Sequence, residues 1–179
     1  MPFTPNAELD LAFDAKLIPQ SVIDELPDDL HIRPLSSSDH SRGHIQVLQA
    51  LTTVPDPGAQ AWSDRFRLIQ TASPQTYYPI VILDKQKDTI VATGTVFMER
   101  KFIRNLGDCG HIEDIAVDKN VQGKGLGKRI IQALTGISDA SGAYKTILDC
   151  SEDNQPFYVK CGYKYAGVEM AKYNVPSSH

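Results

Sequence analysis

The stretch of sequence that decides the fold is HIEDIAV at residues 111–117, followed four residues later by QGKGLG at residues 122–127. The first block is typical of a β-strand, and the second is a glycine-rich turn. Behind that turn, apolar residues recur at the spacing of one helix face: Ile130, Ile131, Leu134 and Ile137. The sequence therefore predicts a strand that runs through a glycine-rich turn into a long amphipathic helix.

Outside this stretch, the pattern predicts further strands and helices of a mixed α/β domain. Predicted strands lie at His31–Leu35, Tyr78–Leu83, Ile90–Met98, Thr146–Cys150 and Tyr165–Lys172. Helical spacing predicts helices over Ile45–Leu51 and Trp62–Ile69, and a short helix over Asn154–Lys160. We expect a single domain at residues 31–179, with residues 1–30 as an extension packed on it.

Composition narrows the class of protein. Of 179 residues, 41% are apolar and 22% charged, which fits a globular domain rather than a fibrous, disordered or membrane protein. The sequence has neither a membrane-spanning apolar run nor a secretory signal, so we expect a cytoplasmic protein without a membrane span. A net charge of −4 argues against nucleic acid as a partner. The three cysteines contain no C-x-x-C pair, and we expect free, mostly buried thiols.

The glycine-rich turn is predicted to bind an anion, because unpaired backbone N–H groups and the positive end of the helix dipole meet there. A Walker loop needs Gly at position 122 and Ser or Thr at 129, where this chain has Gln122 and Arg129. A Rossmann fingerprint starting at Gly123 needs a glycine where this chain has Lys128. Both nucleotide motifs are therefore excluded, which leaves the pattern Q-x-x-G-x-G.

In its strand, turn and helix context, Q-x-x-G-x-G resembles the pyrophosphate loop of the GNAT superfamily of N-acetyltransferases. Within it, the chain resembles the glucosamine-6-phosphate N-acetyltransferase family through HIEDIAV and through YK at 144–145, LDC at 148–150, FY at 157–158, KCGY at 160–163 and AGVEM at 166–170. The resemblance extends from Leu30 to Tyr173. It implies the GNAT acyl-CoA N-acyltransferase fold, an α/β (α+β) fold with a mixed, mostly antiparallel sheet, flanked by helices and splayed after the strand at 111–117.

The resemblance also implies acetyl-CoA as co-substrate and no metal. The residues that it assigns to acetyl-CoA are Ile115, Ala116, Val117, Gln122, Gly123, Lys124, Gly125, Leu126, Gly127, Lys128, Asn154, Tyr158 and Lys160. His40 and His44 have the spacing of a zinc pair, but no further ligand pattern follows them, so a solvated helix face is favoured.

The reaction that the resemblance implies is direct attack of an amine on the thioester in a ternary complex. Glu113 is expected to orient or deprotonate the amine, with Asp149 as another polar contributor. Tyr158 is expected to stabilise the leaving thiolate. Because Glu113 and Asp114 are adjacent on a strand, we expect their side chains to face opposite ways. Which carboxylate or water acts as the base stays open.

Arg100, Lys101 and Arg104 place three cations in five residues, which is a candidate clamp for a sugar phosphate. The resemblance assigns the acceptor, D-glucosamine 6-phosphate, to Thr52, Lys101, Phe102, Ile103, Arg104, Glu113, Asp114, Tyr144, Lys145 and Tyr173. Family members carry a basic residue at the position of Tyr173, so whether Tyr173 or Lys172 contacts the phosphate stays open.

The resemblance further implies a homodimer in which the C-terminal strand crosses to the partner, so that Tyr144, Lys145 and Tyr173 serve the partner's site. It places the reaction in the hexosamine pathway toward UDP-N-acetylglucosamine.

Three alternatives remain. The acceptor could be another small amine or a protein N-terminus, or the chain could sense acetyl-CoA without turning it over. Covalent catalysis by Cys150 or Cys161 is disfavoured because no histidine lies close to either in sequence.

Overall fold

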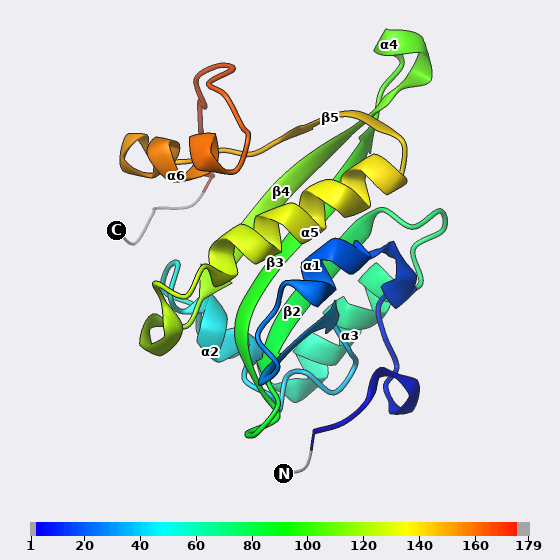
Figure 1. Ribbon diagram of the computed structural model, residues 1–179. Coiled ribbons are helices and arrows are strands. Elements are labelled where there is room, and N and C mark those ends of the chain that lie inside the picture. The colour runs from blue at the N-terminus through cyan, green and yellow to red at the C-terminus, as the bar shows by residue number, and fades with distance from the viewer. Residues whose placement is uncertain (1–2, 175–179) are drawn as a thin grey trace. The chain divides into compact units, whose positions relative to one another are not determined.

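The computed structural model describes residues 3–174, and the chain divides after Leu148 into two compact units, residues 1–148 and 149–179. The first unit contains a five-stranded sheet in the order β1-β2-β3-β4-β5 (Figure 1). Its strands are β1 (Leu30–Pro34), β2 (Tyr77–Asp84), β3 (Thr89–Arg100), β4 (Asp108–Val117) and β5 (Ala143–Ile147). Neighbouring strands from β1 to β4 are antiparallel, whereas β5 is parallel to β4. The predicted mixed, mostly antiparallel sheet is confirmed.

The helices of the first unit are mostly short. They are η1 (Asn6–Glu8), η2 (Ala15–Leu17), α1 (Gln20–Asp24), α2 (His44–Leu48), α3 (Ala59–Gln70), α4 (Ile103–Leu106), η3 (Lys119–Val121) and α5 (Leu126–Ala140). The second unit contains η4 (Glu152–Asn154) and α6 (Gln155–Lys160). Among the described residues, no helix is long and apolar enough to cross a bilayer.

Helix α5 lies across one face of the sheet, over β3 and β4 (Figure 1). Its buried residues include Ile130, Leu134 and Ile137 of the predicted apolar face. The close approach requires a glycine in β3, because a Cβ on Gly94 would lie 2.6 Å from Ile130 Cγ2. The predicted strand, turn and helix at residues 111–140 are therefore present, and the helix packs back on the strand that precedes it.

The opposite face of the sheet is covered in part by α2 and α3. Trp62 and Phe66 stack with their ring centroids 5.7 Å apart and belong to the core cluster with Val81 and Ala116 of the sheet. His44 joins the helices to the sheet: its Nδ1 accepts a hydrogen bond from the Trp62 indole at 3.1 Å, and its Nε2 lies 3.4 Å from Thr93 Oγ1.

The N-terminal residues pack on the first unit. Ala12, Ile18 and Val22 are buried, and the backbone N–H of Ala12 donates to the carbonyl of Leu35 at 2.8 Å. Pro19 lies directly against Gly136 on α5. Because Gly136 has no side chain, the extension can pack closely on the helix.

The prediction of a last strand over Tyr165–Lys172 is wrong. Among the described residues, no strand follows α6, and residues 165–172 are exposed. Tyr165, Val168 and Met170 are 69%, 81% and 94% exposed. A strand needs a neighbouring strand to accept its backbone hydrogen bonds, and the described part of the second unit contains none.

Several boundaries also differ from the predicted ones. The strand predicted at Thr146–Cys150 lies at Ala143–Ile147, and the strand predicted from His111 begins at Asp108. The helix predicted over Ile45–Leu51 ends at Leu48. All three cysteines are free as expected, but only Cys109 is buried, so the prediction of mostly buried thiols is wrong.

We predict that His44 makes the stability of the fold depend on pH. Burial lowers the pKa of His44 from its usual 6.5 to about 4. Between these two values the unfolded chain takes up a proton that the folded chain resists, so the free energy of unfolding falls as pH falls. From pH 7 to pH 5 this one group is expected to remove about 2 kcal/mol.

Urea unfolding at the two pH values tests this prediction. His44→Gln should be less stable at pH 7 but should lose about 2 kcal/mol less than the parent on acidification. Phe66→Leu is the control, because it destabilises the same core without removing a titrating group. Equal losses in all three proteins would contradict the prediction.

Candidate active site

Strand β4 separates from β5 before the midpoint of β4. The parallel pairing runs from Asp108↔Ala143 to His111↔Ile147, whereas β3 pairs with β4 as far as Val117. From residue 112 onward, the edge of β4 that would face β5 therefore has no β5 partner in the described structure. Backbone N–H groups without a strand partner are hydrogen-bond donors for a ligand. The sheet is splayed as predicted, but the splay begins after His111, within the strand predicted at 111–117 and not after it.

A β-bulge interrupts β4 within the stretch that has no β5 partner. Thr93 of β3 pairs with Ala116, whereas Thr95 pairs with Glu113, so β4 contains one extra residue between the two pairs. Asp114 adopts a left-handed conformation with φ of +54°. The bulge interrupts the regular alternation behind the prediction that Glu113 and Asp114 face opposite ways. Both residues are exposed.

The glycine-rich turn has the geometry of an anion site. Gly123 and Gly125 adopt φ of +82° and +77°, conformations that side chains disfavour, and Gly125 caps α5. The backbone hydrogen bonds of α5 begin with the one from the N–H of Arg129 to the carbonyl of Gly125. The N–H groups of residues 126–128 precede it at the positive end of a 15-residue helix. Gln122 donates from Nε2 to the carbonyl of Val117 at 3.2 Å, which ties the turn to β4.

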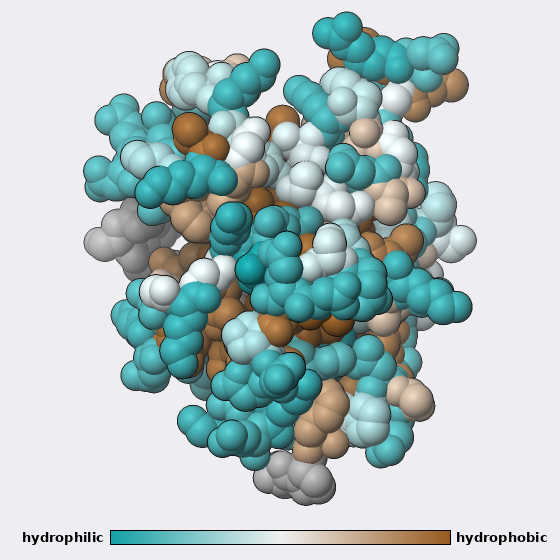
Figure 2. Space-filling view, viewed as in Figure 1, coloured by the Kyte–Doolittle hydropathy of each residue, from teal (hydrophilic) through white to brown (hydrophobic). Residues whose placement is uncertain are grey.

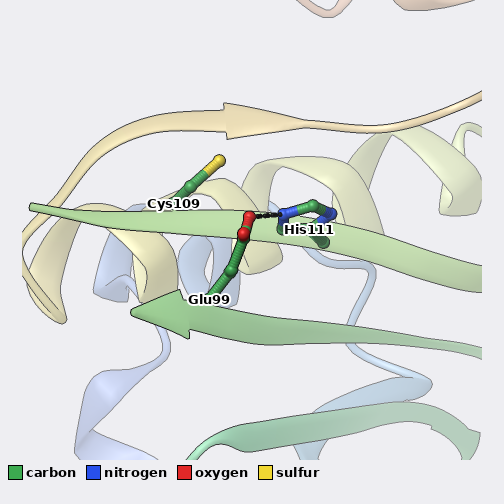
Figure 3. A group of neighbouring side chains, drawn as sticks. All are labelled: Glu99, Cys109 and His111. Carbon is green, nitrogen blue, oxygen red and sulfur yellow. Dashed lines mark hydrogen bonds and ion pairs between the residues drawn. The ribbon is translucent and has the colours of Figure 1, made fainter. Parts of the chain in front are cut away.

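At the other end of β4, charged side chains gather on one face of the sheet. Glu99 pairs with Cys109 and Phe97 with His111, so these four side chains lie on the same face. The Glu99 carboxylate accepts a hydrogen bond from His111 Nε2 at 2.8 Å (Figure 3). It accepts another from Lys101 Nζ at 2.6 Å. The Lys101 bond holds the pKa of Glu99 below its usual value, and Glu99 raises the pKa of Lys101. Lys101 is therefore a fully charged, positioned cation at neutral pH.

The segment that carries the predicted clamp projects from the sheet. Arg104 has φ of +56° within α4, and Phe102 and Ile103 are 95% and 65% exposed. Figure 2 shows apolar surface beside polar surface at this segment. Arg100 lies outside the cluster, because its guanidinium donates to Thr76 Oγ1 and to the carbonyl of Gln75.

Tyr144 and Lys145 lie near the same end of the sheet. Lys145 Nζ lies 5.8 Å from the centroid of the Tyr144 ring. The charges of Lys101 and Lys145 both act on the Cys109 thiol, but burial is the larger effect and raises its pKa. Three predicted acceptor residues, Lys101, Tyr144 and Lys145, are thus brought together, whereas Thr52 lies exposed in the segment between α2 and α3.

The second unit carries the remaining predicted residues. Asp149 and Lys160 are exposed, and Asn154 joins η4 to α6. Tyr158 is half-buried on α6, and burial raises the pKa of its phenol above the usual value of 10. Tyr158 is therefore a protonated hydroxyl at neutral pH, able to donate a hydrogen bond. Tyr173 is 65% exposed.

A pocket of about 780 Å³ lies elsewhere on the first unit. Residues of the segments 40–50 and 118–120 line it, together with Thr89 and Ile90. None of the predicted site residues lines this pocket. The candidate active site therefore consists of the β4 edge without a β5 partner, the glycine-rich turn, and the charged cluster of Glu99, Lys101 and His111.

The sequence prediction missed Glu99, Cys109 and His111 as a group. Cys109 and His111 follow Glu99 by 10 and 12 positions in the sequence, and only the register between β3 and β4 brings Glu99 next to them. The predicted strands end at Met98 and begin at His111, so they include neither Glu99 nor Cys109, and the local pattern carried no signal of this juxtaposition.

Comparisons with known proteins identify the family of this chain. The model of the acetyltransferase (GNAT) family matches residues 45–163. Glucosamine 6-phosphate N-acetyltransferase 1 of Dictyostelium discoideum is 45% identical over 86% of this chain and 94% of its own length. The glucosamine 6-phosphate N-acetyltransferase of Candida albicans is 40% identical over 81% of this chain and 96% of its own length.

A solved structure shows the same fold. The crystal structure of glucosamine-6-phosphate N-acetyltransferase from Arabidopsis thaliana superposes with a TM-score of 0.79 at 38% identity, and the match covers 82% of this chain and 99% of that one. Sequence, fold and the glycine-rich turn thus lead to one conclusion: this chain belongs to the acetyltransferase (GNAT) family, as an acetyl-CoA-dependent N-acetyltransferase.

Proposed function

We propose that this enzyme acetylates the amine of D-glucosamine 6-phosphate with acetyl-CoA and releases N-acetyl-D-glucosamine 6-phosphate and CoA. The observation that carries the proposal is the positioned Lys101 at one end of the face on which Glu113 lies. Glu113 lies on β4, and Lys101 follows directly after β3, where it is bonded to Glu99; His111 lies between Cys109 and Glu113 on that face. A phosphate at one end and an amine at the other fit this distribution of charge.

Acetyl-CoA binds along the unpaired edge of β4 and at the glycine-rich turn in this proposal. The backbone of residues 115–117 takes the thioester end, and one of its N–H groups polarises the thioester carbonyl. The N–H groups at the start of α5, with Lys124 and Lys128 nearby in sequence, take the pyrophosphate. The sequence resemblance also assigns Asn154, Tyr158 and Lys160 to acetyl-CoA.

The amine needs only a weak base. An amine beside electron-withdrawing sugar carbons titrates more like an α-amino group, near 8, than like lysine, so removing its proton at pH 7 costs about 1.4 kcal/mol. We assign Glu113 to orient this amine and to accept its proton, directly or through water, and Asp149 as a second polar contributor. Asp114 contributes to acceptor binding. The neutral amine then attacks the thioester carbonyl.

Tyr158 stabilises the leaving group. The thiolate of CoA has a pKa near that of cysteine, about 8.5, so a hydrogen bond from a protonated phenol lowers the cost of its departure. The raised pKa of Tyr158 supports this role, because the phenol keeps its proton at neutral pH.

The proposed phosphate clamp consists of Lys101 and Arg104 on the segment before β4, with the backbone of Phe102 and Ile103. Thr52 and Tyr173 complete the proposed acceptor contacts. Arg100 is excluded from the clamp by its bonds to Gln75 and Thr76.

The enzyme is proposed to act as a homodimer. The C-terminal residues 165–172 have no strand partner in the described chain and expose large apolar side chains. Exposed apolar segments of this kind mark protein interfaces. Pairing with a strand of a second copy would bury them and would bring the neighbouring Tyr173 to the partner's site.

We place the reaction in the cytoplasm, on the route toward UDP-N-acetylglucosamine. The names of the curated relatives support the substrate, and the compartment and pathway rest on the sequence resemblance.

We predict that acetyl transfer requires the 6-phosphate of the acceptor. CoA release, followed with a thiol-reactive dye, should be fast with glucosamine 6-phosphate and slow with glucosamine. Lys101→Ala with Arg104→Ala should raise KM for the phosphorylated sugar about 10- to 100-fold, because two charge-assisted hydrogen bonds are lost. Arg100→Ala is the matched control and should leave KM near the parent value. Equal rates with both sugars would mean that the acceptor is another amine.

We predict separate effects of Tyr158 and Glu113 on the chemical step. Tyr158→Phe should lower kcat about 100-fold with little change in KM, because only the hydrogen bond to the leaving thiolate is lost. Glu113→Gln should lower kcat as well. Tyr165→Phe removes a phenol hydroxyl from the same unit and should keep the parent kcat. Steady-state kinetics that show equal kcat values for Tyr158→Phe and the parent would remove Tyr158 from the mechanism.

We predict that light scattering on a sizing column gives twice the chain mass of 19.8 kDa. Val168→Asp with Met170→Asp should give the monomer mass, since charges cannot be buried unpaired in an apolar interface. Leu68→Asp is the control, because Leu68 is 70% exposed on α3 and lies outside the C-terminal segment. A parent protein of monomer mass would contradict the dimer.

A further inference from the structure

We propose that Glu99, Cys109 and His111 form a binding site for a thiophilic divalent cation such as Zn²⁺. A carboxylate oxygen, a thiol sulfur and an imidazole nitrogen all lie within 4.8 Å of one another (Figure 3). The proposal concerns the face of the β3–β4 pair and does not depend on the identity of the acetyl acceptor.

The strand register holds the three side chains together. Glu99 lies directly opposite Cys109 in the antiparallel ladder, and His111 lies two residues further along β4, on the same face. The His111 ring is fixed by stacking on Phe97, with ring centroids 4.6 Å apart and planes tilted by 20°. Coordination therefore needs only side-chain rotation and no movement of the backbone.

The donor set selects the kind of metal. Zinc takes sulfur at about 2.3 Å and imidazole nitrogen or carboxylate oxygen at about 2.0–2.2 Å. Tetrahedral geometry at these lengths separates ligand atoms by roughly 3.5 Å, so atoms within 4.8 Å need shifts of about 1 Å. Three protein ligands leave a fourth position for water. Magnesium and calcium prefer all-oxygen sites, and a set with sulfur and nitrogen disfavours them.

Solvent reaches the site from one side. Cys109 is buried, but the side chains of Glu99 and His111 are 40% and 22% exposed. The Cys109 thiol has only a weak contact, from Sγ to the carbonyl of Gly110 at 3.7 Å. An entering cation would replace the thiol proton, which passes to solvent, and the Nε2 proton of His111 would move to Nδ1 through solvent so that Nε2 can ligate.

The metal and the Lys101 ion pair exclude one another. The Glu99 oxygen that contacts His111 Nε2 also accepts from Lys101 Nζ, so a cation bound between Glu99 and His111 must displace the ammonium group. Two like charges at one carboxylate repel, and the charge of Lys145 adds to the repulsion because it also acts on Cys109. Removing the Lys101 charge should therefore tighten metal binding.

The test uses Co²⁺ as a spectroscopic substitute for zinc. Cys150→Ser with Cys161→Ser leaves Cys109 as the one thiol in the full-length chain, and metal-free protein of this background is titrated with Co²⁺. We expect a thiolate-to-cobalt charge-transfer band that Zn²⁺ abolishes and that Cys109→Ala lacks. A background protein without the band would overturn the proposal.

Further variants in this background identify the other ligands. Glu99→Gln and His111→Gln should each weaken cobalt binding by at least about 10-fold, which is the smallest effect usual even for groups that only support a ligand. Lys101→Met should tighten it several-fold. His40→Gln is the control, because His40 is bonded to Asp56 on another part of the first unit and should leave the affinity unchanged.

Circular dichroism on each variant separates loss of a ligand from loss of the fold. Affinity that is unaffected by both Glu99→Gln and His111→Gln in folded protein would show that Cys109 binds metal elsewhere and would refute the site. If Lys101→Met leaves the affinity for cobalt unchanged or weakens it, the proposed exclusion between the metal and the Lys101–Glu99 ion pair is refuted.

Discussion

The structure depends on a constraint on strand β4, which is paired along its length on one side and for less than half of it on the other. The ladder with β3 keeps β4 extended and fixes which side chains share a face. The ladder with β5 ends at His111↔Ile147. Backbone donors that a sheet would normally satisfy are thereby left for a ligand, and the left-handed Asp114 bends the strand at the same place.

Packing in the rest of the first unit stabilises β4 although one of its edges lacks a strand partner. Helix α5 packs on one face, with Gly94 giving it close approach, while Trp62 and Phe66 pack on the other face. His44 links this second layer to β3 through neutral hydrogen bonds. The strand that carries the splayed edge is thus packed on both faces.

The charged end of the β3–β4 pair has two exclusive uses in our proposals. With Lys101 on Glu99, the sheet presents a fixed ammonium group for a sugar phosphate. With a metal on Glu99, Cys109 and His111, that ammonium group is released. Because the metal would take the carboxylate that positions Lys101, metal binding would change the affinity for the phosphate.

The local pattern of the sequence determined the strand, turn and helix at residues 111–140, because apolar periodicity and glycines at left-handed positions act over a few residues. It also determined most strands of the sheet and, through the match of Q-x-x-G-x-G and its neighbouring motifs, the family. The final strand failed because residues 165–172 have strand-like sequence but no partner in the described chain.

Only the tertiary structure decided the place where β4 leaves β5, the bulge at Asp114, and the meeting of Glu99, Cys109 and His111. It also turned Arg100 away from the proposed clamp. These features depend on the register between strands, and a shift of one residue sends every side chain to the other face. Local sequence carries the tendency to form a strand, but the packing of the whole sheet sets the register.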